Sequence, residues 1–257
     1  MSRIIAVVSG KGGVGKTTVV TNLSTVLSSS FNKKVTVIDC NVTSSNLALH
    51  FGLYPSVATL NAILKGEAKI EDALLPHPSG VHVISASQNL SDLIGVDIAL
   101  LSEKLKNAFP TEDFVFLDSA PGFGKEAVSV MKACEEAIIV STPDIPSLTD
   151  AVREKEVLRE VKVKPIGLIL NKVTHKKFEL TEDEIRDLIK LPILGVIPFT
   201  EKFMESLAAK IPLVSYDKHS DASFEFYKIA SFLTEEPFEF PRLSFLEKLR
   251  RIFRKLS

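Results

Sequence analysis

The stretch GKGGVGKTT, residues 10–18, decides the fold. From Gly10 to Thr17 it has the form GxxxxGK[ST], and it directly follows an apolar run at residues 4–8. Glycines allow backbone N–H groups to curl around phosphate oxygens, and a helix that begins there presents its N-terminus to the same anions. We expect Lys16 to reach the β- and γ-phosphates and the Thr17 hydroxyl to bind Mg²⁺. The sequence therefore predicts a strand, a phosphate-binding loop and a helix.

The rest of the chain alternates short apolar, β-branched runs with longer helical patterns. Several runs are apolar almost throughout, which is typical of parallel strands buried on both faces. The alternation predicts an α/β fold, with a mostly parallel central sheet and helices on both faces. The predicted strands are 4–8, 34–38, 81–84, 114–117, 137–140, 165–170 and 194–197. The predicted helices are 16–28, 96–107, 124–133, 147–160, 181–189, 200–208 and 223–233.

Composition excludes several classes of protein. The 257 residues fit one large domain, and 45% hydrophobic residues suffice for a core. The two cysteines, Cys40 and Cys134, form no CxxC pair, which argues against a disulfide framework, an Fe–S cluster or a thiolate zinc site. There is no apolar run of about 20 residues and no export signal. We expect a soluble, cytoplasmic protein.

Charge is unevenly distributed along the chain. The net charge is −1, but residues 242–257 hold six basic residues and one acidic residue, so residues 1–241 sum to −6. An acidic body disfavours nucleic acid as a partner, whereas the basic C-terminus favours an acidic surface.

A second lysine, Lys11, lies inside the phosphate loop, and with it KGGVGKTT resembles the deviant Walker A motif of the MinD/ParA family of ATPases. Four later segments agree with that family in order and approximate spacing. The resemblance covers essentially the whole chain, and MinD-like proteins of the archaeal type look most similar. These segments are VIDCN (37–41) with SNL (45–47), FLDSAPG (116–122), LNK (170–172) and VIP (196–198).

The resemblance implies an ATPase with the MinD/ParA type of P-loop fold, which uses ATP and Mg²⁺ and forms an ATP-bound homodimer. It implies that Lys11 reaches the phosphates bound by the other subunit, that Asp118 acts at the metal with Thr17, and that Asn171 contacts the adenine. The predicted catalytic residues are Lys11, Lys16, Asp39, Asn41 and Asp118. The predicted nucleotide-binding residues are Gly10, Lys11, Gly12, Gly13, Val14, Gly15, Lys16, Thr17, Thr18, Asn171 and Pro198.

General chemistry supports two of these assignments. An acidic residue at a strand end beside Mg²⁺, such as Asp118, can hold a metal-bound water. The amide of Asn171 both donates and accepts, so it can match the N6/N7 edge of adenine. The alternative for Asn171 is a turn residue that follows a strand.

The chain departs from the family at Asn41. The family has D-x-D after the second strand, whereas this chain has Asp39-Cys40-Asn41. An amide accepts a hydrogen bond but cannot take a proton, and general-base help is worth ~10²–10⁴-fold. We therefore expect intact ATP binding with slow or partner-dependent hydrolysis. The alternative is a neutral replacement, because phosphoryl transfer depends mainly on positioning and charge stabilisation.

The C-terminus predicts an amphipathic helix. We assign 1–233 to the ATPase domain, 234–241 to a linker with two prolines and three glutamates, and 242–257 to the helix, whose start at Ser244 has the S-x-x-E form of a capping box. At ~100° per residue the apolar side chains share one face with flanking basic residues, as in helices that bind a membrane interface. The family also carries such a C-terminal helix. The apolar positions are Phe245, Leu246, Leu249, Ile252, Phe253 and Leu256, and the flanking cations are Lys248, Lys255 and Arg250.

Together these features predict a MinD-like ATPase that dimerises with ATP, associates reversibly with the cytoplasmic face of an anionic membrane and positions a regulatory or cargo protein in cell division or polar placement. Three alternatives are a DNA-partitioning ATPase of ParA type, a non-hydrolysing ATP-bound scaffold, and an Fe–S carrier of Mrp type, which the absence of CxxC disfavours. For the C-terminal helix alone, the alternatives are docking on its own domain or on a protein partner.

Overall fold

The computed structural model describes residues 2–54 and 58–238. Within them an eight-stranded sheet has the order β3-β4-β2-β5-β1-β6-β7-β8, and every neighbouring pair is parallel except β3 with β4. This confirms the predicted α/β fold. The strands are β1 (Arg3–Val8), β2 (Val35–Asp39), β3 (Leu75–Pro76), β4 (His82–Ile84), β5 (Phe114–Asp118), β6 (Glu136–Ser141), β7 (Lys164–Val173) and β8 (Ile193–Pro198).

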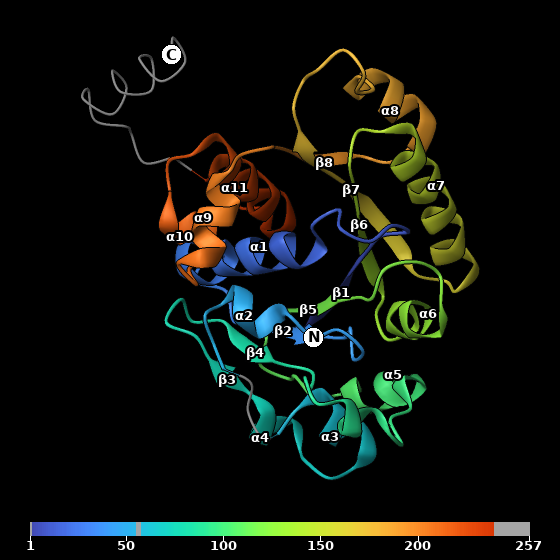
Figure 1. Ribbon diagram of the computed structural model, residues 1–257, viewed down its shortest axis with the longest axis vertical. Coiled ribbons are helices and arrows are strands. Elements are labelled where there is room, and N and C mark those ends of the chain that lie inside the picture. The colour runs from blue at the N-terminus through green and yellow to red at the C-terminus, as the bar shows by residue number, and fades with distance from the viewer. Residues whose placement is uncertain (1, 55–57, 239–257) are drawn as a thin grey trace.

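Helices cover both faces of the sheet, and side chains of alternate strand positions enter two separate cores. In Figure 1, α1, α9, α10 and α11 lie together on one side, and α6, α7 and α8 lie on the other. The longer helices are α1 (Lys16–Phe31), α6 (Lys125–Lys132), α7 (Ile145–Glu160), α8 (Glu182–Ile189), α9 (Lys202–Ala208) and α11 (Asp221–Thr234). The shorter ones are α2 (Leu47–His50), α3 (Leu60–Lys65), α4 (Ile70–Ala73), α5 (Leu101–Leu105) and α10 (Leu213–Tyr216), with 3₁₀ turns η1 (Leu90–Leu93) and η2 (Ile98–Leu100).

Local sequence explains where the long helices begin. Asp144 caps α7 by accepting a hydrogen bond from the Ser147 N–H, with Pro146 in the first turn. Thr181 and Glu184 form a capping box at the start of α8. The N-cap of α1 is instead Gly15, with φ 101°, and no side chain caps this helix. The first N–H groups of α1 therefore stay available to an anion.

Several details differ from the sequence predictions. The helix predicted at 96–107 is a 3₁₀ turn followed by the single short helix α5. The sequence did not predict the two-residue β3, the 3₁₀ turn η1 or the short helices α2, α3, α4 and α10, because elements of this length carry no measurable periodicity. β7 continues past residue 170 to Val173, which places Asn171 inside a strand.

The first part of the predicted linker packs on the domain. Beyond α11, the Phe238 ring stacks on Tyr227 with centroids 4.5 Å apart and lies 5.2 Å from Phe31, and Lys33 Nζ lies 2.6 Å from Glu236 Oε1. The predicted membrane-binding residues of 242–257 lie outside the described residues. No helix within the described ranges is long and apolar enough to cross a membrane.

Candidate nucleotide site

The site lies at the carboxyl ends of the central strands, where β1 separates β5 on one side from β6 on the other. Open α/β sheets bind ligands in this crevice. The phosphate loop follows β1, Asp118 ends β5, Asp39 ends β2, and Pro198 ends β8. The sheet therefore brings predicted residues from these four separate segments to one edge.

The phosphate loop has a backbone that only glycine adopts easily at two positions. Gly13 has φ 77° and Gly15 has φ 101°, both in the region that L-residues rarely occupy. A Cβ at Gly15 would also lie 2.2 Å from Asn171 Nδ2. Glycine at position 15 thus lets the loop pack directly against the Asn171 amide.

Lys16 is buried at the start of α1, with 7% of its surface exposed. Its ammonium donates to Ser9 Oγ at 2.8 Å, and Ser9 is the residue that precedes the loop. Burial lowers the pKa of Lys16, while the charges of Asp118 and Glu154 raise it. The lysine is therefore held close to the loop by an adjacent hydroxyl and nearby carboxyl groups.

The residues predicted to bind metal meet directly. Thr17 Oγ1 donates to Asp118 Oδ2 at 2.6 Å, and Asp118 Oδ1 is buried without a partner. Burial, and then the charge of Asp39 on the neighbouring strand, raises the pKa of Asp118 to about 7, against the opposing effects of Thr17 and Lys16. A hydroxyl and an orphaned carboxylate oxygen side by side are hard oxygen donors suited to Mg²⁺. A divalent cation would satisfy the orphaned oxygen and favour the ionised carboxylate.

Asp39 shapes the segment that follows β2. Its Oδ2 accepts from Ser45 Oγ at 2.8 Å and from the N–H groups of Asn46 and Leu47, both at 3.1 Å, and its Oδ1 accepts from the Asn41 N–H at 3.1 Å. Burial raises the pKa of Asp39, and these four donors lower it. These four hydrogen bonds anchor the loop, so Asp39 fixes the position of the Asn41 backbone.

Asn41 itself is half-buried and faces a polar neighbourhood. Its Oδ1 lies 3.3 Å from Thr43 Oγ1, and the same hydroxyl is 3.4 Å from Glu126 Oε2 on α6. Glu126 was not singled out from the sequence, and burial raises its pKa against the effect of the Thr43 hydroxyl.

Lys11 points away from the interior of the loop. Its side chain is 48% exposed, and its ammonium lies 3.6 Å from Asp144 Oδ1 and 3.3 Å from Ser147 Oγ at the start of α7. Sequence reasoning missed both partners. The signal that could have found Asp144 is an N-cap residue placed directly after a buried strand, hence at the same sheet edge as the loop.

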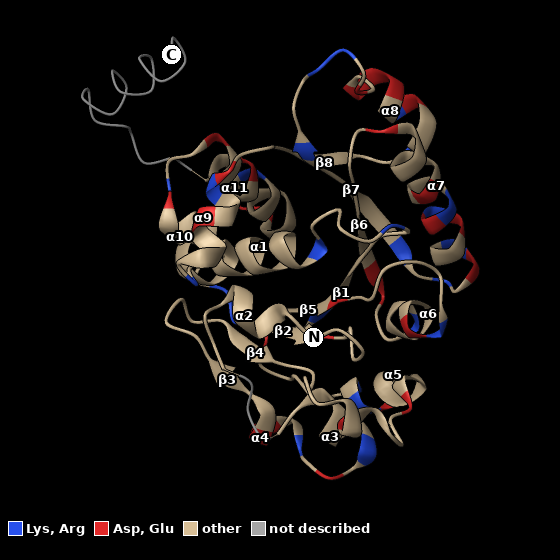
Figure 2. Ribbon diagram, viewed as in Figure 1, with Lys and Arg blue, Asp and Glu red and all other residues tan. Residues whose placement is uncertain are grey.

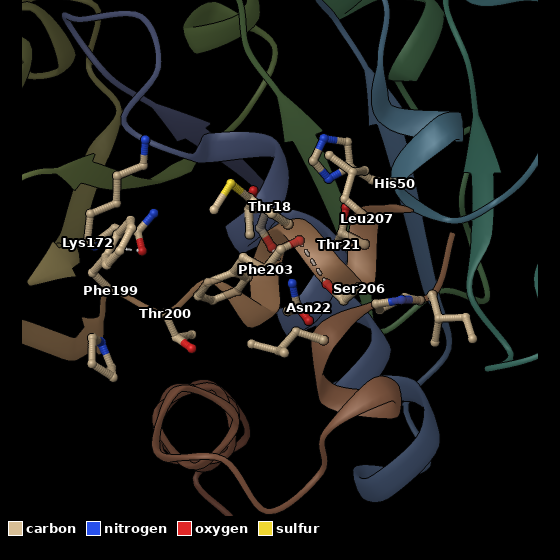
Figure 3. Close-up of a pocket in the computed structure, with 16 residues that line it drawn as sticks. Thr18, Thr21, Asn22, His50, Lys172, Phe199, Thr200, Phe203, Ser206 and Leu207 are labelled. Atoms are coloured by element: carbon tan, nitrogen blue, oxygen red, sulfur yellow. Dashed lines mark hydrogen bonds between the residues drawn. The ribbon is translucent and has the colours of Figure 1, made fainter. Parts of the chain in front are cut away.

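Asn171 lies under the phosphate loop. Its Nδ2 donates to the Val14 carbonyl at 2.7 Å, and the adjacent Lys172, with φ 58°, donates from Nζ to the Gly13 carbonyl at 2.7 Å. Its role in reading adenine stays a prediction. Asn171 and Pro198 nevertheless both line one pocket of about 230 Å³ (Figure 3), together with Thr18.

That pocket is mainly apolar. Figure 3 shows Phe203 near Thr18, Phe199 beside Lys172 on one side, and Leu207 and His50 on the other. Such a lining, with polar groups among the apolar and aromatic side chains, suits a flat aromatic base. The position next to Thr18 connects the pocket to the phosphate loop.

The chain is similar in sequence and in fold to known nucleotide-binding proteins. Residues 5–213 match the family model of the CobQ/CobB/MinD/ParA nucleotide binding domain. The chain is 32% identical over 258 residues to an ATP-binding protein of Methanocaldococcus jannaschii described as uncharacterized, covering 98% of both chains. It is 33% identical to the septum site-determining protein MinD of Synechocystis sp., covering 100% of this chain and 99% of that one. MinD of Pyrococcus horikoshii, solved with Mg-ADP, has a TM-score of 0.87 and 34% identity, covering 91% of this chain and 96% of that one. Sequence, fold and site geometry agree, and the chain belongs to the CobQ/CobB/MinD/ParA nucleotide-binding family.

Proposed function

We propose that this protein is a MinD-like ATPase in which Mg-ATP drives dimerisation and reversible membrane association, so that it positions a partner protein. The observation that carries the proposal is the loop with two lysines: Lys16 is buried against Ser9, whereas Lys11 is exposed at the mouth of the site. One lysine serves the loop's own phosphates, and the other is free to serve a second subunit.

Mg-ATP binding is supported by the groups the site provides. Lys16 and the loop N–H groups would hold the phosphates, and Thr17 with Asp118 would hold Mg²⁺. The metal ion would neutralise charge on the β- and γ-phosphates. Family membership and the Mg-ADP complex of the Pyrococcus horikoshii relative support the same assignment.

We infer that hydrolysis is slow unless a partner stimulates it. Asn41 stands where the family has its second aspartate, and an amide cannot accept the proton of the attacking water. Asp39 holds the backbone N–H of Asn41, and the Asn41 amide would orient a water without deprotonating it.

Dimerisation would use the exposed Lys11. Its partners Asp144 and Ser147 lie at the N-terminus of α7, and exposed ion pairs of this kind are worth at most about 1 kcal/mol. Lys11 can therefore leave them at little cost when a phosphate of a second subunit becomes available.

Membrane association would use residues 242–257. The six apolar side chains of the predicted helix contribute ~1.5–3 kcal/mol each if fully buried, and each cation adds ~1 kcal/mol near anionic lipid. Ordering the segment costs ~1–2 kcal/mol per residue, so a single copy binds marginally. Two copies on one dimer gain ~10²–10⁴-fold by effective concentration. Dimerisation would thus switch membrane binding on.

The DNA-partitioning alternative is less well supported. Residues 1–241 carry −6, and Figure 2 shows acidic and basic residues interspersed along α7 and mostly acidic residues on α8. A surface that binds DNA without sequence preference needs clustered cations.

The test is co-sedimentation of the protein with phosphatidylglycerol vesicles in ATP or ADP. Binding with ATP alone supports the switch. Binding with either nucleotide contradicts it and favours the constitutive scaffold, and no binding contradicts membrane association. Leu249→Glu, which places a charge on the apolar face, should abolish sedimentation, whereas Arg251→Lys, outside that face and with the charge kept, should not.

A further inference from the structure

Glu154 is a buried carboxyl group on α7 that has no role in the nucleotide site described above. It is 0% exposed, and neither of its carboxylate oxygens has a hydrogen-bond partner. Sequence reasoning did not single it out, because a glutamate among the other charged residues of an outer helix is expected to face the solvent. An unpaired polar group at this depth is rare in folded proteins and points to a functional role.

The helix places Glu154 beside the phosphate loop. Asp150 lies one turn earlier on the same face of α7, and it is so close to the loop that a Cβ added at Gly10 would come within 2.7 Å of Asp150 Cβ. Glu154 in turn acts electrostatically on Lys16, the lysine that the loop presents to phosphate. The carboxyl group is therefore part of the surroundings of Lys16 although it makes no hydrogen bond to it.

The elements packed against α7 offer Glu154 no other charge to pair with in the part of the chain that the structure describes. β6 and β7 contribute Ile139, Leu168 and Leu170 to the core shared with α7, and α8 contributes Ile185 and Ile189. Burial raises the pKa of Glu154 to about 8, the Lys16 charge lowers it, and the Asp150 charge raises it. Glu154 is thus mostly protonated at neutral pH.

Bound ATP would make the ionised form of Glu154 less favourable still. The triphosphate brings several negative charges to Lys16, and the attraction between Lys16 and a Glu154 carboxylate would then compete with the attraction between Lys16 and the phosphates. A neutral Glu154 removes one of the negative charges that would compete with the nucleotide for Lys16.

We propose that Glu154 is a positioning residue of the nucleotide site, which must carry a proton while the phosphate loop holds ATP. This inference rests on the nucleotide binding proposed above. It makes ATP affinity depend on pH through a residue that touches neither the nucleotide nor the metal.

The direction of the pH effect follows from the protonation of Glu154 in the free protein and in the ATP complex. Well below its pKa of about 8, Glu154 is protonated with or without ATP, so its contribution to affinity is constant. Above its pKa in the free protein, binding must first return a proton to Glu154, and affinity falls by up to ~10-fold per pH unit until the higher pKa of the complex is reached.

The experiment measures the Kd of the full-length protein for a fluorescent ATP analogue with Mg²⁺ between about pH 7 and about pH 9.5. Glu154→Gln keeps the shape of the neutral acid and cannot ionise. We expect it to match the wild type at pH 7 and to escape the rise in Kd, so that it binds ~10-fold more tightly than the wild type at about pH 9.5. Glu156→Gln is the matched control, because Glu156 is on the same helix but 55% exposed, and it should follow the wild-type curve.

A second measurement uses the unaltered protein. Titration calorimetry of ATP at about pH 8.5, in two buffers of different ionisation enthalpy, should show net proton uptake that Glu154→Gln lacks. If Kd depended on pH in the same way for the wild type and Glu154→Gln, or if both took up equal numbers of protons, the role of Glu154 would be overturned while nucleotide binding would stand. Failure of the wild type to bind at pH 7 would instead overturn nucleotide binding, and this inference with it.

Discussion

Replacing Gly15 with alanine tests how the phosphate loop is built. At φ 101° an L-residue is strained by ~1–2 kcal/mol. The new Cβ would lie 2.2 Å from Asn171 Nδ2, so the amide must move and release the Val14 carbonyl that it now contacts at 2.7 Å. A buried acceptor left without its donor costs ~1–3 kcal/mol. Together the two effects predict a loss of ~2–5 kcal/mol in the free energy of unfolding.

Gly13→Ala is the matched control. Its φ of 77° imposes a similar backbone strain, but no atom lies within 4 Å of the added Cβ. We expect it to cost only ~1–2 kcal/mol. Urea unfolding of the nucleotide-free protein, followed by circular dichroism, measures both variants.

The contact with Asn171 can be isolated by combining variants. In an Asn171→Ala background the obstructing amide is gone, so Gly15→Ala should cost only the strain of ~1–2 kcal/mol. The reasoning is refuted if Gly15→Ala and Gly13→Ala destabilise the protein equally, or if the cost of Gly15→Ala is the same with and without Asn171.

Two further predictions concern catalysis and assembly. Asn41→Asp should raise steady-state phosphate release from Mg-ATP by ~10²-fold or more, because it restores a proton acceptor beside the site; equal turnover would show that the amide is a neutral replacement. Lys11→Ala should keep ATP binding and stability, since its ammonium is exposed and 3.6 Å from Asp144 Oδ1, but should lose the ATP-dependent dimer in light scattering after gel filtration. A Lys11→Ala dimer of wild-type strength would remove this lysine from the interface.

Much of the fold was accessible from the sequence because its signals are local. A buried parallel strand shows as a short apolar run, and the phosphate loop shows as glycines at fixed spacing between a strand and a helix. Both patterns can be recognised within a short stretch of sequence. The same limit explains the error at 96–107, where an apolar, helix-like pattern is divided between a 3₁₀ turn and the short α5 by its packing on α6.

By itself the sequence determined the fold class and the family, and it predicted that phosphate and metal chemistry falls to Lys16, Thr17 and an aspartate at the end of a strand. Only the tertiary structure decided what surrounds them. It joins Thr17 to Asp118 across 101 residues, places Asp39 beside Asp118 so that the charge of Asp39 raises the pKa of Asp118, and buries Glu154 near Lys16. Hydrogen bonds and charge interactions act through space. The order of the strands in the sheet brings together groups that are far apart along the chain, and the sequence does not show which of these groups will be neighbours.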